Sequence, residues 1–440
     1  MTREEILSVL LRWNIWGKNR EKRTFPREHL RRILNLKDYH GVVVIKGPRR
    51  AGKSTLLYQI MEVLSKERET ESLLYVNFED YAFSSEELTP KTLEAIVDVY
   101  KQEIYRGNDF LLFLDEIQNV NEWHRWIRTA VDSGLIRTAF VTGSSSKLLS
   151  GELATLLTGR HIDFEVLPFS FKEYVAFRGA NPTRKLDLIA NKDKYISLLV
   201  EYLTYGGFPE VVSNVEDKHL VNSILSHYAE DIVLKDVATR YEVENLKLLK
   251  ILSKLIAQNT GNRLSIRKLQ RHFESIFGKS ASTTTISNYI SYLESAYFCF
   301  EVPSFDFSIK KISKKPSKYY LVDTGLRNII SPSFTPDRGR LLENAVYLKL
   351  KSMYEEIYYW EGKNEIDFVC KKGKDLVLYN VSYVSQESEV KERELKGFVE
   401  FPFPVGERYL ITWDLRTEIS LDGVKIKAVP AYLFLLDIID

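Results

Sequence analysis

Cysteine is scarce in this chain, which has only Cys299 and Cys370 among its 440 residues. The two lie far apart in the sequence and in apolar surroundings. Such a pattern argues against a metal site built on cysteine ligands. We interpret both residues as packed thiols in a reducing compartment.

Long apolar runs are also missing, because no stretch of 18 apolar residues occurs and the chain starts with the charged segment MTREE. Neither a membrane-spanning helix nor a signal peptide is therefore predicted. The formal net charge is only +2, so any nucleic-acid or membrane partner must be met by a local patch. We expect a soluble cytoplasmic protein with roughly two to four domains.

A complete phosphate-loop motif, GPRRAGKS, starts at Gly47. It follows the β-branched run 42–45 and precedes a helical apolar pattern over 56–64, so it joins a strand to a helix. The backbone N–H groups of such a turn favour a polyphosphate. We predict that Lys53 contacts the β- and γ-phosphates and that Ser54 binds Mg²⁺. The predicted nucleotide-binding residues are Gly47, Pro48, Arg49, Arg50, Ala51, Gly52, Lys53, Ser54 and Thr55.

Two carboxylates, Asp115 and Glu116, end an apolar run that starts at Phe110. The run is typical of a strand buried on both faces. Paired acids at the end of such a strand are costly to bury unless they have partners. We predict that Asp115 holds the Mg²⁺ shell and that Glu116 orients or deprotonates the attacking water.

The first part of the chain alternates strands and helices. Strands are predicted at 42–46, 73–78, 110–115 and 137–142, with helices ending near 66, 105 and 133. This alternation predicts a parallel sheet covered on both sides. One whole strand separates the loop strand from the Asp-Glu strand, which indicates the additional-strand class of phosphate-loop ATPases. The predicted fold class of this part is therefore α/β, a phosphate-loop core built on a parallel sheet.

Two more polar residues are candidates for the catalytic site. Ser144 follows the strand over 137–142, where hydroxyl groups would face the γ-phosphate. Arg160 is a candidate for stabilising transition-state charge, either in its own chain or across a subunit boundary. A simple Ser/Thr turn and a surface arginine are the alternatives.

Beyond about residue 168 the pattern becomes helical, starting with the capping-box spacing of Ser170 and Glu173. The glycine pair in 205–210 indicates a tight connection, which we interpret as a lid joint. Residues 243–300 have the order of parts of a winged helix. DNA contact is predicted within residues 263–320, where basic residues alternate with aromatic ones, and packing against a protein is the alternative. The side chains concerned are Arg263, Arg267, Lys268, Arg271, Thr284, Ser287, Asn288, Ser291, Lys310, Lys311, Lys314, Lys315, Lys318, Tyr319 and Tyr320.

An ordered set of motifs makes a family resemblance recognisable. Beside the phosphate loop these are LDEIQ from Leu114, TGSSS from Thr142, LTGR from Leu157, YGGFP from Tyr205, YLVDTGL from Tyr320 and EIDF from Glu365. From about residue 40 onward the chain resembles AAA-type ATPases of archaea and bacteria. In that family a winged helix and a degenerate nuclease-like domain of unknown function follow the nucleotide domain. The resemblance implies ATP or ADP and Mg²⁺ as cofactors, and adenine in preference to guanine.

The resemblance also implies that the last domain is similar to the PD-(D/E)xK nucleases. Glu343 and Asp367 match the first two acidic positions of that pattern. Asn380 and Ser382 stand where a carboxylate and a lysine are expected. Since asparagine brings no charge to a metal and serine brings no ammonium group, we expect this domain not to cut nucleic acid.

These inferences predict a Mg²⁺-dependent ATPase whose nucleotide cycle controls a C-terminal DNA- or protein-binding module. The alternatives are a nucleotide-gated DNA-binding switch with negligible turnover and an ATP-driven nuclease of a defence or mobile-element system. Candidate partners are ATP, DNA, a protein client and further copies of the chain, and no membrane is expected. The predicted domains are an N-terminal helical segment (1–40), the ATPase core (41–168), the lid or linker (169–242), the winged helix (243–325) and an inactive nuclease-like domain (326–440).

Overall fold

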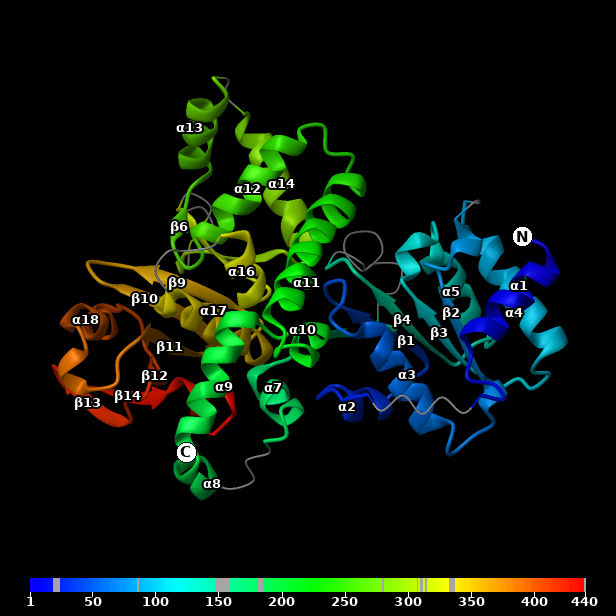
Figure 1. Ribbon diagram of the computed structural model, residues 1–440, viewed down its shortest axis with the longest axis horizontal. Coiled ribbons are helices and arrows are strands. Elements are labelled where there is room, and N and C mark those ends of the chain that lie inside the picture. The colour runs from blue at the N-terminus through cyan, green and yellow to red at the C-terminus, as the bar shows by residue number, and fades with distance from the viewer. Residues whose placement is uncertain are drawn as a thin grey trace. The chain divides into compact units, whose positions relative to one another are not determined.

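The computed structural model describes residues 1–18, 24–84, 87–146, 159–180, 185–278, 281–306, 308, 312, 315–331 and 337–438 (Figure 1). The chain folds into two compact units, residues 1–167 and residues 168–440. No helix among these residues combines the length and the apolar composition that a membrane span requires.

The first unit is built on a five-stranded parallel sheet with the strand order β2-β3-β4-β1-β5. Its strands are β1 (Gly41–Lys46), β2 (Leu73–Asn77), β3 (Leu111–Asp115), β4 (Thr138–Gly143) and β5 (His161–Glu165). Because β4 lies between the loop strand β1 and the Asp-Glu strand β3, the sheet confirms the additional-strand fold. Strand β5 was not predicted, since its sequence HIDFE buries only Phe164.

Helices cover both faces of this sheet (Figure 1). They are α1 (Arg3–Trp13), α2 (Leu30–Leu34), α3 (Lys53–Leu64), α4 (Pro90–Glu103) and α5 (Trp123–Asp132). Successive strand residues point to opposite faces. Accordingly Val42 and Val44 pack in one core with α1, α4 and α5, whereas Val43 and Ile45 pack in another with α2 and α3. Two-sided burial explains why these strands are uninterrupted apolar runs.

The N-terminal segment completes an edge of the sheet. The side chain of Asn14 donates to the carbonyl of Tyr75 at 2.8 Å and accepts from its N–H at 2.7 Å. These backbone groups belong to the edge strand β2, which would otherwise present them unpaired. Trp13 and Arg12 both bind the carboxylate of Asp80, the former at 2.6 Å. The first helix is therefore part of the first unit.

The second unit begins with a helical region. Its helices are α7 (Phe171–Phe177), α8 (Lys185–Ala190), α9 (Lys192–Tyr205), α10 (Pro209–Ser213) and α11 (Lys218–Asp231), and α11 continues into a π-helical segment, Ile232–Thr239. The predicted capping box is present at the start of α7. Ser170 accepts from the Glu173 N–H at 3.1 Å, and the Glu173 carboxylate accepts from the Ser170 N–H at 3.0 Å.

Three helices and a small antiparallel sheet follow, in the predicted order of parts. The helices are α12 (Leu246–Gln258), α13 (Ile266–Phe277) and α14 (Thr283–Ser295). The strands β6 (Arg263–Leu264), β7 (Cys299–Val302) and β8 (Ser317–Leu321) form a sheet in the order β6-β8-β7. Ser265 caps α13 and Ser282 caps α14, which fixes where both helices begin.

The glycine pair at the end of α9 is tied to the start of α16 (Thr324–Ile330). The Gly207 N–H donates to the Asp323 carboxylate at 2.7 Å, and Asp323 also caps α16 through the Leu326 N–H at 3.0 Å. Gly206 has φ +79°, and a Cβ there would lie 2.0 Å from Asp323 Oδ1. Burial raises the pKa of Asp323 to about 6. Two motifs that are far apart in the sequence therefore meet in one turn.

The C-terminal part contains a six-stranded mixed sheet with the order β13-β14-β12-β11-β10-β9. The strands are β9 (Ile357–Glu361), β10 (Glu365–Lys372), β11 (Asp375–Ser382), β12 (Glu407–Thr412), β13 (Thr417–Leu421) and β14 (Val424–Pro430), and the helices are α17 (Arg338–Met353), α18 (Glu392–Glu400) and α19 (Ala431–Leu435). Cys299 and Cys370 are buried free thiols, as predicted.

Candidate nucleotide site

The phosphate loop joins β1 to α3 at the carboxyl edge of the first sheet. A Cβ on Gly47 would lie 2.0 Å from the carbonyl oxygen of Val166, so only glycine fits where the chain leaves β5. Gly52 caps α3 with φ +97°, a conformation that side chains disfavour. Gly47 also donates to the Gly143 carbonyl at 3.3 Å, which brings the ends of β1 and β4 together. The loop is thus shaped by contacts on both sides.

We expect Gly47→Ala to disturb this loop. The new methyl group meets a backbone atom that cannot rotate away, and overpacking of this kind costs about 1–3 kcal/mol of unfolding free energy. Urea denaturation should show a lower free energy of unfolding for the first unit, and ATP titration should show weaker binding. Gly339→Ala, whose Cβ would meet nothing within 4 Å, is the matched control and should change neither. An unaltered Gly47→Ala protein would contradict the described loop packing.

A buried arginine from the N-terminal segment braces the loop. Arg27 donates to the Ala51 carbonyl at 2.6 Å and to the Leu167 carbonyl at 2.7 Å. The arginine thereby links the loop to the segment that follows β5. No motif marks Arg27, because its partners lie far away in the sequence, and the sequence analysis missed it.

Asp115 ends β3 within a network of hydroxyl groups. Tyr75 donates to Asp115 Oδ2 at 2.7 Å, and Thr142 donates to Oδ1. Burial and the charge of Glu116 raise the pKa of Asp115, and hydrogen bonds from Ser54, Thr142 and Tyr75 oppose this rise. A carboxylate and a serine hydroxyl side by side are hard oxygen donors of the kind that Mg²⁺ prefers. Ser54 and Asp115 therefore fit a magnesium ion, whose positive charge would offset the cost of burying the acid.

Glu116 forms a buried ion pair with the lysine of the phosphate loop. Lys53 Nζ lies 3.3 Å from Glu116 Oε1 and donates to the Pro48 carbonyl at 3.0 Å. Lys53 is 4% and Glu116 6% exposed. Burial alone would raise the pKa of Glu116, but the charge of Lys53 and a hydrogen bond from Gln118 lower it below its usual value. The carboxylate is therefore ionised at neutral pH, as a base or a water-orienting group requires.

The backbone of Glu116 is held in an unusual conformation. Its φ is +54°, in the left-handed region that non-glycine residues seldom adopt. The Thr142 hydroxyl accepts from its N–H at 2.9 Å and so fixes the turn. A strained backbone persists only where its neighbours hold it. Held in this way, the turn directs the carboxylate of Glu116 toward Lys53. Thr142 and Tyr75 are thus positioning residues that the sequence analysis did not identify.

The remaining two catalytic candidates are placed differently. Ser144 is buried, and Gln118 Nε2 lies 3.5 Å from its hydroxyl while also donating to Glu116, so Ser144 belongs to the site. Arg160 lies before β5, at the level of Gly41 and thus at the opposite end of β1 from the loop. Its guanidinium pairs with Asp132.

This placement of Arg160 corrects the prediction for its own chain. Because the length of β1 separates the arginine from the phosphate loop, it does not reach the loop of the same chain. A role across a subunit boundary stays a prediction. Leu157 and Thr158 of the same motif lie outside the described residues.

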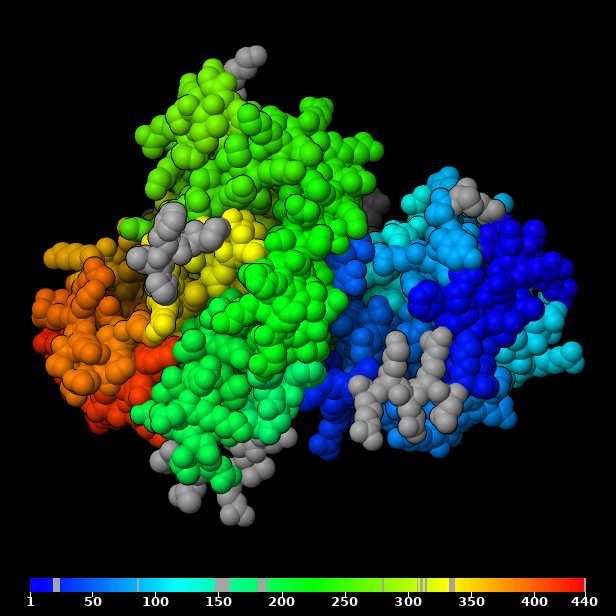
Figure 2. Space-filling model, in the orientation of Figure 1, coloured from blue at the N-terminus to red at the C-terminus, as the bar shows by residue number. Residues whose placement is uncertain are grey.

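The predicted DNA footprint is only partly on the surface. Lys318, Tyr319 and Tyr320 are buried, so these three residues are wrong as DNA contacts. Arg263 is exposed and pairs with Glu361, and its contact with DNA stays a prediction. Lys310, Lys311 and Lys314 lie outside the described residues. Arg267, Lys268 and Arg271 on α13 and Thr284, Ser287 and Asn288 on α14 are exposed. In the space-filling view the outer face of α13 is not covered by the rest of the second unit (Figure 2).

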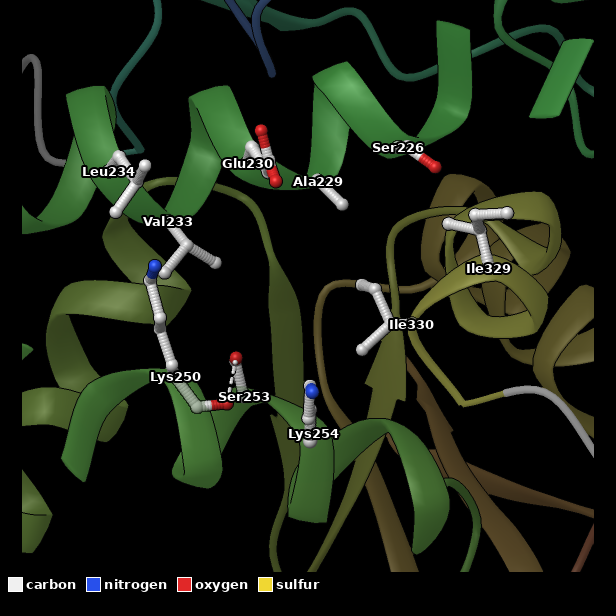
Figure 3. A pocket seen from close by; sticks show the side chains of 10 residues that line it. All are labelled: Ser226, Ala229, Glu230, Val233, Leu234, Lys250, Ser253, Lys254, Ile329 and Ile330. Atoms are coloured by element: carbon white, nitrogen blue, oxygen red, sulfur yellow. Dashed lines mark hydrogen bonds between the residues drawn. The ribbon is translucent and has the colours of Figure 1, made fainter. Parts of the chain in front are cut away.

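A cavity of about 490 Å³ lies in the second unit between α11 with its π-helical continuation, α12 and α16 (Figure 3). Lys250 and Lys254, one turn apart on α12, line one side of it, and Glu230 lies on the opposite side. Ile329 and Ile330 form an apolar part of the cavity lining. None of the residues predicted from the sequence to be functional lines this cavity.

Asp367 on β10 and Asn380 on β11, two of the positions matched to the nuclease pattern, are in contact. Asn380, at the third position, has a structural role. Asn380 Oδ1 accepts from the Asp367 N–H at 2.8 Å, and its Nδ2 donates to the carbonyls of Glu394 at 2.7 Å and Glu365 at 3.3 Å. A carboxylate has no N–H group to donate to these two carbonyls. Asparagine therefore suits this environment better than the acid of the nuclease pattern.

Comparisons with known proteins agree with the first unit's architecture. Residues 39–175 match the family model of an AAA domain, and residues 196–337 and 338–432 match two domains of unknown function, DUF8612 and DUF4143. An uncharacterized protein of Methanocaldococcus jannaschii is 36% identical over 362 residues, which are 81% of this chain and 78% of that protein. An uncharacterized protein of Haemophilus influenzae is 30% identical over 409 residues, 92% of this chain and 97% of that protein.

Among solved structures, a Walker-type ATPase of Pyrococcus abyssi has a TM-score of 0.42 and 16% identity, with 72% of this chain and 99% of that chain covered. The sequence likeness to the two relatives extends beyond the AAA domain into the rest of the chain.

Proposed function

The chain belongs to the family of AAA-domain proteins that includes these relatives from Methanocaldococcus jannaschii and Haemophilus influenzae, and from this premise we propose that it is a Mg²⁺-dependent ATPase. Its nucleotide cycle controls a DNA- or protein-binding module in the C-terminal part. The observation that carries the proposal is the buried pair of Lys53 and Glu116 beside Asp115, at the mouth of the phosphate loop.

The residues of the site divide the tasks of this function among them. The loop N–H groups and Lys53 bind the phosphates, and Ser54 and Asp115 hold the magnesium ion. When bound, the ion supplies positive charge that neutralises the phosphate oxygens. Glu116 takes the proton of the attacking water or orients it, and Lys53 keeps that carboxylate ionised until the phosphates are present. Ser144 reports on the γ-phosphate through Gln118.

The binding module is proposed on the exposed side chains of α13 and α14. Lys268 and Arg271 supply positive charge, and Thr284, Ser287 and Asn288 supply hydrogen-bonding groups on the next helix. This combination favours phosphate contacts by the first helix and groove contacts by the second. An ATP-driven nuclease is not proposed, because Asn380 and Ser382 supply neither the charge nor the ammonium group that cleavage requires.

Phosphate release from ATP tests the proposal. We expect turnover that requires Mg²⁺ and stops with EDTA, measured on protein whose mass in solution is determined with ADP and with a non-hydrolysable ATP analogue. Stimulation by duplex DNA would favour a motor or remodeller. ATP-dependent DNA affinity with negligible turnover would instead favour the switch. A protein that shows no turnover and binds no nucleotide would overturn the proposal.

A further inference from the structure

A buried lysine in the second unit is surrounded by three carboxylates. Lys318 lies on β8 and is only 2% exposed. Its Nζ is 2.6 Å from Glu365 Oε1, 3.0 Å from Asp367 Oδ1 and 3.3 Å from Glu343 Oε1. The carboxylates come from β10 and α17, so residues distant in the sequence converge on one ammonium group.

The charges of this cluster are not balanced by Lys318 alone. Three carboxylates face one ammonium group, and Arg263 on β6 compensates part of the excess by pairing with Glu361 and lying 3.7 Å from Glu365. Burial by itself lowers the pKa of Lys318, but the charges of Glu343, Asp367 and Glu365 raise it well above its usual value, so the lysine is charged. Burial raises the pKa of Glu343 to about 7.

The surroundings of the cluster hold the carboxylates in place. The Tyr320 hydroxyl donates to Glu343 Oε1 at 2.6 Å, and the Val381 N–H donates to Asp367 Oδ2 at 3.0 Å. Gly261 has φ +75°, and a Cβ there would lie 3.0 Å from Glu343 Oε1, so the glycine leaves room for the acid. Oxygen atoms fixed around one point in this way form a cation site, and in this chain the cation is an amine.

We infer that the ammonium group of Lys318 is the resident cation of this cluster, which closes it to divalent metal ions and locks β8 to the C-terminal sheet. As they stand around the ammonium group, the three carboxylates are not placed to hold a metal ion, and neither are any other three His, Cys, Asp or Glu side chains in the described part of the chain. The lock is reinforced by the Tyr359 hydroxyl on β9, which donates to the Pro316 carbonyl just before β8. Removal of Lys318 leaves three partly buried carboxylates without their shared cation, which is destabilising unless another cation enters.

Lys318→Met tests this inference, because methionine fills the space without a charge. We expect the variant to bind one more Mn²⁺ per chain than the wild-type protein, measured by equilibrium titration with MnCl₂ in the absence of nucleotide. The double variant Lys318→Met/Asp367→Asn should lose the additional ion. Lys427→Met, which removes an exposed lysine on β14 of the six-stranded sheet, should bind as the wild type does. Equal Mn²⁺ stoichiometry in folded Lys318→Met and wild-type protein would overturn the inference.

A melting experiment covers the case in which Lys318→Met does not fold in buffer. Lys318→Ala leaves a space for an added cation, so MnCl₂ or ethylammonium chloride should raise its melting temperature toward the wild-type value. Neither salt should rescue Lys318→Ala/Asp367→Asn to the same extent. If neither cation restores the fold of Lys318→Ala, Lys318 is not replaceable by a cation and the inference is wrong. These measurements use no ATP and are therefore independent of the proposed ATPase function.

Discussion

Glu116→Gln is expected to bind ATP as the wild-type protein does but to hydrolyse it about a hundredfold or more slowly, since a general base typically contributes that much. Glutamine has the same length, so the buried site keeps its volume, and its one carbonyl oxygen still accepts a hydrogen bond from Lys53 or from Gln118, which bind different oxygens of Glu116. It has no charge with which to take a proton from water. Single-turnover phosphate release measures the chemical step, and equilibrium titration with a fluorescent ATP analogue measures binding.

Glu122→Gln is the matched control for this variant. Glu122 is an exposed glutamate of the same unit that pairs with Arg125 on the surface. It should change neither binding nor turnover. If Glu116→Gln hydrolyses ATP at the wild-type rate, Glu116 is not the base. If it loses ATP binding while its melting temperature is unchanged, the division of tasks between loop and carboxylate is wrong.

Lys53→Ala is expected to weaken ATP binding about ten- to a hundredfold, the equivalent of one charge-assisted contact of about 1.5–3 kcal/mol. The substitution also leaves Glu116 buried without its cation, since the two side chains are 3.3 Å apart. Burial then acts on an unpaired acid and raises the pKa of Glu116. Hydrolysis by the variant, if driven by high ATP, should therefore show a pH profile shifted upward relative to wild type.

Lys66→Ala serves as the control, because Lys66 is exposed just beyond the end of the same helix. Its ATP affinity should equal that of the wild-type protein. Thermal melting of both variants separates lost binding from lost folding, since removal of one partner of a buried pair is destabilising. Wild-type affinity in folded Lys53→Ala would show that the phosphates are bound elsewhere.

Much of the first unit could be predicted because its signals are local. The apolar runs 42–45 and 110–114 determine strands buried on both faces, and the loop motif places a helix directly after the first of them. Strand β5 escaped prediction because HIDFE is short, carries two acidic residues and buries only Phe164. Its existence depends on pairing with β1, which no local pattern encodes.

The site was predictable to the extent that its residues belong to motifs. Lys53, Asp115, Glu116 and Ser144 come together at the ends of β1, β3 and β4, where parallel strands bring their carboxyl ends to one edge. Arg27 was missed because it acts on backbone carbonyls that are distant in the chain. Contacts of this kind depend on tertiary structure and have no sequence pattern of their own.

Whereas Arg27 was missed, Lys318 was predicted to be functional and was placed wrongly on the surface. A run of lysines beside tyrosines favours a solvated, basic surface, because charged side chains are seldom buried. Three carboxylates from β10 and α17 reverse that expectation by supplying the counter-charge inside the unit. Their positions relative to β8 follow only from the fold, so the sequence could not distinguish a DNA contact from an internal ion pair.

Titration calorimetry of the intact, monodisperse protein with Mg·ATP tests the central claim most directly. The account predicts a saturable heat of one nucleotide per chain, with an affinity about ten- to a hundredfold weaker in Lys53→Ala and unchanged in Glu116→Gln. No heat with the wild-type protein at millimolar Mg·ATP would contradict it.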